Sequence, residues 1–467
     1  MSMSNTILNL KKWSSPVEQP GRLEWASAAI VFVAAILLYS QGKDLLHIVY
    51  YSKMFINTLI HGQALDFYTL SETPSHTWAT YSPFVYLIFG ISYLPFQLIE
   101  AIFGITFSIP MQLLTGKVVI ACWLGACTIL LGRLIRLLGL GIQHTRWGVY
   151  LFLTSPIAVF CSVLFGQIDI ISIAFTLAAL VFFSRKQYWA FVAFMAPAIC
   201  FKWFGLFLVI PLILLVEKRI GHAIGYIACS ISGVLVTWLI YGHNQGYINS
   251  QAAAEGAYGF KARLFVGNFF GQMISLSMLC FILVCVACYI IRYDHSNLGI
   301  YLSTIPLIIY GSLLLFYYPH PQWFILLVPY LILMALQARS IRIPLLVDSL
   351  LSIGLLLFND TNHPRDSDNY AINNGVISWL SGRRYEGPPL LNAFKHIWYD
   401  NPSAVSITIL TAGLLVMIAL AISALRHPSD SKRPDDRIEV ERGLVYLRQS
   451  ILVIVYMIPA IILFILR

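Results

Sequence analysis

Charged side chains are scarce in this sequence. Asp, Glu, Lys and Arg make up 11% of the 467 residues, whereas soluble domains contain about 25%. Hydrophobic residues make up 58%, and the mean hydropathy is +0.77. This composition excludes a soluble globular domain and predicts an all-α polytopic membrane protein. Because excess Lys and Arg mostly records orientation in such proteins, the net charge of +9 does not indicate a nucleic-acid partner.

Several motifs that carry chemistry are missing as well. The sequence contains no Walker loop, no GxGxxG that opens a helix, no zinc-ligand spacing and no nucleophile–His–Asp set. Nucleotide chemistry is therefore not expected. The eight cysteines all fall in apolar runs, which is typical of small core residues rather than disulfides or a metal pair. A polar start and the lack of a small-residue cleavage site argue against a cleaved signal peptide.

Apolar runs long enough to cross a bilayer recur along the whole chain. A span needs roughly 17 to 25 residues. We expect about 13 spans, and a long first outer loop that carries interfacial helices. The expected spans are 24–40, 110–132, 147–165, 170–184, 188–201, 203–216, 222–241, 269–291, 298–317, 322–338, 343–358, 402–425 and 449–466.

Two segments could be divided differently. Segment 83–103 is apolar enough to span, but Pro83, Pro95, Glu100 and its many aromatic residues favour an interfacial or re-entrant helix. Segment 188–216 could be one helix or a hairpin. Since Lys202 would cost about 2.5 to 3.5 kcal/mol at mid-bilayer, we predict a hairpin with Lys202 at its tip.

The positive-inside rule supports both choices. With a cytoplasmic amino terminus, short basic turns such as 133–146, 184–186 and 217–219 all lie inside. Loop 427–448 also lies inside, and its charges of both signs predict a solvated linker. The outer face then collects the unusual polar residues of the chain.

The organising stretch is the polar segment 43–83 after the first span. Asp44 lies at the membrane exit with His47 close by, and Tyr81-Ser-Pro opens the next apolar run. Apolar residues at helical spacing predict a surface helix over 48–60. Asp44 could be a general base for an acceptor hydroxyl. The alternative is a solvated residue that marks the end of a span.

Other outer residues have a binding and a structural interpretation each. Gln167 and Asp169 could bind sugar hydroxyls or orient the base, or they could form an exposed turn in which Asp169 caps the next helix. Lys202 in ICFKWFG could bind a phosphate at membrane depth, or extend its amine to the interface.

The same holds for two later segments. In YYPHPQWF, His320, Gln322 and Trp323 could bind phosphate or sugar, or form part of an aromatic belt. Lys261 and Arg263 could clamp a diphosphate or simply face solvent.

The order of these motifs resembles the GT-C superfamily of membrane glycosyltransferases. The resemblance rests on the acidic residue after span one, aromatic-Ser-Pro, Ser155-Pro156 before Gly-Gln-x-Asp, Lys202 in a short hairpin, and His-Pro-Gln-Trp-Phe. It is strongest for the polyprenol-phosphate-mannose-dependent branch. It implies a catalytic transmembrane module over 1–340, and additional C-terminal helices over 341–467 with an outer loop at 359–401. It also implies that Asp44 is catalytic and that Lys202 contacts the donor phosphate, where we expect His320, Lys261 and Arg263 to contribute as well.

The resemblance implies an inverting transfer of mannose or another hexose from a polyprenyl-phosphate donor to a lipid-linked glycan or other membrane acceptor. Gln167, Asp169, His47, Tyr81, Gln322 and Trp323 would contact the sugar or acceptor. No cofactor is expected, because no second acidic residue stands beside Asp44 to help hold a metal ion. A divalent metal is the alternative. The competing functions are a transporter or flippase, and a polymerase or ligase of lipid-linked glycans. A bacterial plasma membrane is favoured over the endoplasmic reticulum.

Overall fold

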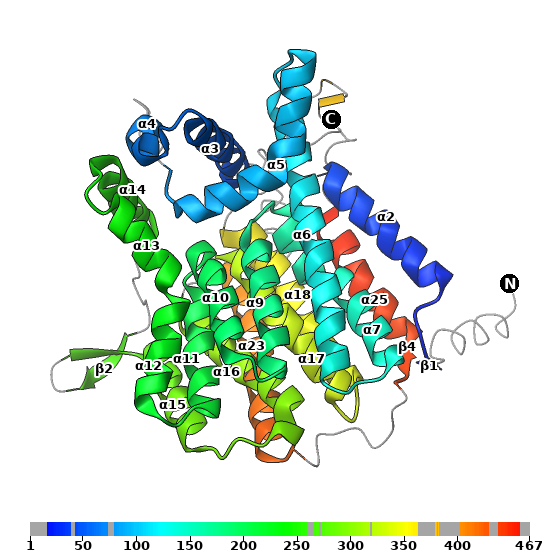
Figure 1. The fold of residues 1–467 in the computed structure, drawn as a ribbon. Coiled ribbons are helices and arrows are strands. Elements are labelled where there is room, and N and C mark those ends of the chain that lie inside the picture. The colour runs from blue at the N-terminus through cyan, green and yellow to red at the C-terminus, as the bar shows by residue number, and fades with distance from the viewer. Residues whose placement is uncertain are drawn as a thin grey trace, which may run out of the picture.

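Helices form almost all of the described structure, as the apolar runs predict. The computed structural model describes residues 16–38, 43–72, 79–258, 265–269, 272–317, 320–362, 379–380, 382, 402–428 and 438–457. In this part of the chain the strands are short. β1 (Pro16–Val17) pairs with β4 (Val440–Glu441), and β2 (Phe265–Phe269) pairs with β3 (Gln272–Ser275), both antiparallel. The chain is therefore an all-α, multi-pass membrane protein (Figure 1).

Helices occupy most of each expected span that the structure describes. In chain order they are α2 (Arg22–Leu38), α3 (Lys43–Ile60), η1 (Ala64–Asp66), α4 (Phe67–Ser71), α5 (Pro83–Phe103), α6 (Ile109–Leu137), α7 (Ile142–Leu153), α8 (Pro156–Ala158), η2 (Val159–Leu164), α9 (Asp169–Ser184), α10 (Tyr188–Phe201), α11 (Phe204–Val216), α12 (Ile220–Ser230), α13 (Ser232–Tyr241), α14 (Gln245–Tyr258), α15 (Leu276–Ile290), η3 (His295–Asn297), α16 (Leu298–Phe316), η4 (Pro321–Leu327), α17 (Val328–Gln337), α18 (Arg342–Asn362), α23 (Pro402–Arg426), α25 (Arg442–Leu452) and η5 (Val453–Met457).

Five described helices are long and apolar enough to cross a membrane. Two further helix pairs, bent by 45° at 154–155 and by 54° at 231, raise this number to seven if each pair is one span. Helices α9, α10, α11 and α15 are apolar but shorter. The count of 13 spans therefore stays a prediction.

The hairpin at Lys202 is confirmed. Helix α10 ends at Phe201 and α11 begins at Phe204, while Lys202 between them is extended (φ −153°, ψ 129°). The two helices run in opposite directions, since Tyr188 at the start of α10 interacts with Glu217 at the end of α11.

The surface helix begins five residues earlier than predicted. Helix α3 starts at Lys43, so Asp44 lies in its first turn rather than in a loop before it. Its apolar face does not lie open to lipid. Leu45, Ile48, Val49 and Phe55 are buried, and α3 packs along α5 at one end of the body, at the top in Figure 1.

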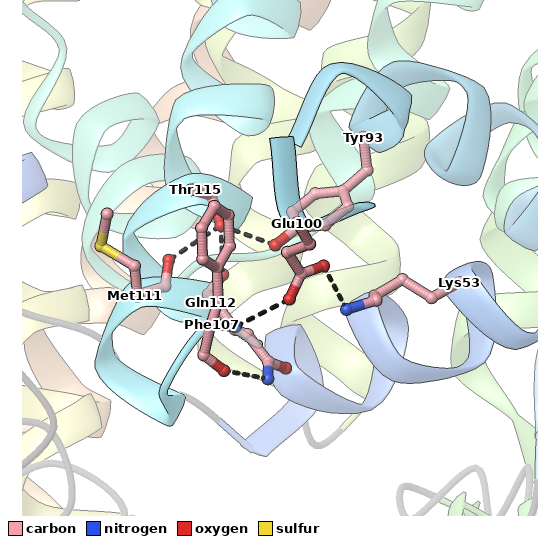
Figure 2. A network of polar contacts seen from close by, with 7 residues as sticks. All are labelled: Lys53, Tyr93, Glu100, Phe107, Met111, Gln112 and Thr115. Atoms are coloured by element: carbon pink, nitrogen blue, oxygen red, sulfur yellow. Dashed lines mark hydrogen bonds and ion pairs between the residues drawn. The ribbon is translucent and has the colours of Figure 1, made fainter. Parts of the chain in front are cut away.

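Helix α5 has the length and composition of a membrane span. The residues that argued against this role are all accommodated. Pro83 occupies the first turn, where a missing N–H is harmless, and Pro95 lies within the continuous helix. Glu100 forms an ion pair with Lys53 of α3 at 2.5 Å and accepts the Phe107 N–H at 2.8 Å (Figure 2). The sequence argument for excluding 83–103 from the spans is therefore not supported.

Two further predictions need correction. Strands β2 and β3 occupy the start of the span predicted from 269, so its helix begins at Leu276. Loop 427–448 was predicted to be a solvated linker. Its described residues just before Arg448 do not fit this prediction, because Ile438, Val440 and Leu444 are buried. Arg448 itself is 1% exposed and forms an ion pair with Asp348, so it does not belong to a basic inner loop.

Candidate functional site at one end of the helical body

Asp44 is held by a residue from a distant segment. Gln167 Nε2 donates a hydrogen bond to Asp44 Oδ2 at 2.5 Å. Gln167 is buried, and it follows Gly166, whose φ of +75° favours glycine. A Cβ at Gly166 would lie 3.1 Å from Leu45 Cδ2. The turn before α9 therefore packs directly on the first turn of α3, and this close packing sets the position of the Asp44 carboxylate.

Lys202 and Asp169 form an ion pair beside it. The Lys202 Nζ lies 3.4 Å from Asp169 Oδ1, and the two side chains are 19% and 4% exposed. The charge of Asp44 also acts on Asp169, so the two carboxylates are close. Lys202, in the break between α10 and α11, therefore lies near Asp169 and Asp44, which come from other segments of the chain.

Tyr81 joins this cluster from the loop before α5. Lys202 Nζ lies 5.1 Å from the centroid of the Tyr81 ring, within the range of a cation–π contact. The backbone of Tyr81 is fixed on both sides. Tyr68 Oη donates to its carbonyl at 2.7 Å, and its N–H donates to Tyr86 Oη at 3.1 Å. The segment before α5 therefore places an aromatic ring beside Lys202.

The segment 320–323 approaches from the start of η4. Trp323 contacts Phe204, with ring centroids 4.8 Å apart, and the His320 ring lies 4.9 Å from that of Trp323. Gln322 is 7% exposed, and its Oε1 has no hydrogen-bond partner among the described residues. An unpaired buried carbonyl oxygen costs free energy. A ligand hydroxyl that donated to Gln322 Oε1 would remove this cost.

The other predicted residues are placed less centrally or fall outside the structure described. His47 lies one helical turn after Asp44, on the same side of α3. Its ring contacts that of Tyr51 at 4.5 Å. Lys261 and Arg263 lie outside the described residues.

An apolar cavity lies next to Trp323. It has a volume of about 210 Å³ and is lined mainly by Phe207, Phe281, Ile309, Leu313 and Tyr317. Tyr317 also stacks on Trp323, with centroids 5.5 Å apart. Sequence reasoning missed this cavity and the role of Phe204, because α11, α15 and α16 are apolar throughout and periodicity does not show which faces meet.

Basic turns lie at the opposite end of these helices. Asp169 opens α9 and Arg185 follows its last residue. Lys218 Nζ, after α11, donates to the carbonyl of Cys288 near the end of α15 at 2.8 Å. At this end hydrogen bonds from Arg219 lower the pKa of Glu217 to about 2. The body thus separates its basic turns from the Asp44–Lys202 cluster by the length of a helix.

Among the described residues, no group of three or more His, Cys, Asp or Glu side chains is placed to hold a metal ion. No protein-family model matches the chain, and a search of curated proteins finds no significant match.

Proposed function

We propose that this protein is an inverting glycosyltransferase of the GT-C type. It would move mannose or another hexose from a polyprenyl-phosphate donor to a lipid-linked glycan or other membrane acceptor, on the extracytoplasmic face. One observation carries the proposal. A carboxylate oriented by an amide, Asp44 with Gln167, and a partly buried cation, Lys202, meet at the same end of a membrane-embedded body.

In this reaction the acceptor hydroxyl attacks the anomeric carbon from the face opposite the phosphate. Asp44 takes the hydroxyl proton as general base. A bond forms between the acceptor oxygen and the anomeric carbon, and the bond from that carbon to the phosphate oxygen breaks. The leaving polyprenyl phosphate keeps the electron pair. Its additional negative charge develops where Lys202 stands, which is the electrostatic stabilisation that such a step requires.

The remaining residues fit substrate contacts in this proposal. Gln322 Oε1 would accept from a sugar hydroxyl, while Tyr81 and Trp323 offer faces to the sugar ring. His320 would donate to the phosphate. The cavity beside Trp323 suits the first units of the isoprenoid chain, because it is apolar and larger than the ~150 Å³ cavities that stay dry and bind benzene.

The proposed reaction needs no nucleotide, since the donor already carries an activated sugar. We place the protein in a bacterial plasma membrane, with the cluster on the extracytoplasmic side. The transporter alternative predicts broken helices with polar residues near mid-membrane. The cluster at one end of the body favours the enzyme.

The deciding experiment uses purified protein in lipid nanodiscs. It is given a panel of synthetic polyprenyl-phosphate sugars and lipid acceptors, and the release of polyprenyl phosphate is measured. A polymerase or ligase would instead use a polyprenyl-diphosphate glycan. A flippase would release neither product but would move the labelled donor across liposomes.

Asp44→Asn is the matched test of the base. It should lower kcat by at least about 100-fold, since general bases contribute roughly 10²- to 10⁴-fold, while the protein stays folded. Glu217→Gln, at the opposite end of the body, is the control and should leave kcat unchanged. Normal turnover by Asp44→Asn would remove Asp44 from the mechanism.

A further inference from the structure

Lys117, in the first half of α6, is a buried lysine whose amine bonds to backbone carbonyls. Its side chain is 2% exposed. Nζ donates to the carbonyl oxygens of Ala35 at 3.1 Å and Ile36 at 3.3 Å. Both carbonyls belong to the last turn of α2 as described, where helix carbonyls have no partner within the helix. The Lys117 amine satisfies these two carbonyls, and the negative end of the helix dipole favours a positive charge at this position.

Gly116, the residue before Lys117, lies against helix α3. A Cβ at Gly116 would lie 3.1 Å from Leu45 Cδ1 and 3.2 Å from Val49 Cγ2. Helix α3 therefore lies close against α6 at this turn because residue 116 has no side chain. One turn of α6 thus binds the end of α2 and the beginning of α3, on both sides of the connection 39–42.

Leu45 links this turn to the candidate site. It contacts Gly116 on one side and Gly166 on the other, and it is 1% exposed. Its neighbour Asp44 accepts the hydrogen bond from Gln167, which follows Gly166. The position of Asp44 therefore depends on how α2 and α3 are fastened to α6.

We propose that Lys117 is a positioning residue for Asp44. The hydrogen bonds of its amine hold the end of α2 against α6, so that the chain enters α3 at the place where Asp44 meets Gln167. Lys117 does not touch the reacting atoms. The inference rests on the proposed function for its catalytic meaning, but the geometry it asserts can be measured without any turnover.

The geometric arm uses crosslinking. Cysteines replace Asp44 and Gln167 in the full chain, and a short bis-methanethiosulfonate reagent joins them, with the linked peptides quantified by mass spectrometry. We expect Lys117→Met to reduce the yield at least threefold and Lys117→Arg, which keeps the cation and its donors, to preserve it. Thr128→Val is the matched control. Thr128 is also buried in α6, but within the described part of the chain its hydroxyl bonds to Leu124 of the same helix and not to another element, so the yield should not change.

The kinetic arm uses the same substitutions with Asp44 and Gln167 intact. Because displacement by about 1 Å can cost 10²-fold in rate, Lys117→Met should lower kcat about 10- to 100-fold with the donor KM within twofold. Lys117→Arg should recover most of the rate. If Lys117→Met does not fold, Lys117→Gln, which keeps a donor amide, replaces it in both arms.

The outcomes separate the two ideas. An unchanged crosslink yield in folded Lys117→Met overturns the positioning role, whatever the activity. A fall in kcat that Lys117→Arg does not reverse also overturns it. If the unmodified protein transfers no sugar, the proposed function fails, while the crosslinking arm still decides whether Lys117 sets the position of Asp44.

Discussion

The ion pair between Lys202 and Asp169 allows the sharpest stability prediction. The Asp169 side chain is 4% exposed and that of Lys202 is 19% exposed. Lys202→Met leaves a buried carboxylate without its counter-ion, and the nearby charge of Asp44 adds repulsion. Removing one partner of a buried pair costs about 3 to 5 kcal/mol. We expect about 3 kcal/mol, the lower end, because partial exposure of Lys202 shows that water can approach.

The reverse substitution should be milder. Asp169→Asn leaves an ammonium that can still reach water and the Tyr81 ring, so we expect about 1 kcal/mol, near the usual cost of a lost hydrogen bond. The double variant carries no unpaired charge. The double variant should lose less free energy of unfolding than the two single variants together. We expect a difference of about 1 to 3 kcal/mol, the coupling usual for residues in contact.

The assay is reversible unfolding of each variant by SDS in mixed micelles, combined in a double-mutant cycle. Arg219→Met is the control, since its ion pair with Glu217 is at the surface, with the Arg219 side chain 73% exposed. Such pairs contribute little, and no change is expected. If the Lys202 and Asp169 losses simply add, the two groups do not act as a pair, and the reasoning about the buried carboxylate is refuted.

Three further predictions concern other parts of the fold. Leu313→Trp should fill the cavity beside Trp323 and raise the KM for a long-chain polyprenyl-phosphate sugar by about 10-fold, since each buried CH₂ contributes ~0.8 kcal/mol. It should spare a short-chain donor, and equal effects on both would exclude the cavity as the lipid site. Arg448→Met should destabilise the protein by about 3 to 5 kcal/mol, because it leaves the buried Asp348 carboxylate without its counter-ion. Adding Asp348→Leu should restore stability. SDS unfolding measures both variants, and an unchanged stability of Arg448→Met would contradict the burial argument. Gly246→Val should separate α14 from α4, because a Cβ there would lie 2.6 Å from the backbone of Tyr68. Limited proteolysis after residue 246 should accelerate, and unchanged cleavage would show that the contact is dispensable.

The helices were predictable because the periodicity and length of apolar runs act locally. The break at Lys202 could also be located, since a lysine within an apolar run has few stable positions in a membrane. The early start of α3 and the pairing of β2 with β3 were not predicted. Helix boundaries depend on packing partners, here α5 and α6 for α3, as much as on local propensity.

Composition and residue order, acting through the bilayer, determined the class of protein and most of the segments that are helical. They also indicated which polar residues would be out of place in lipid. The tertiary structure alone decided that Gln167 holds Asp44, that Asp169 faces Lys202, that Arg448 is buried against Asp348, and that Lys117 binds the end of α2. Each of these contacts joins residues distant in the chain, and their partners follow from how helix faces pack, for which an apolar sequence carries almost no periodic signal.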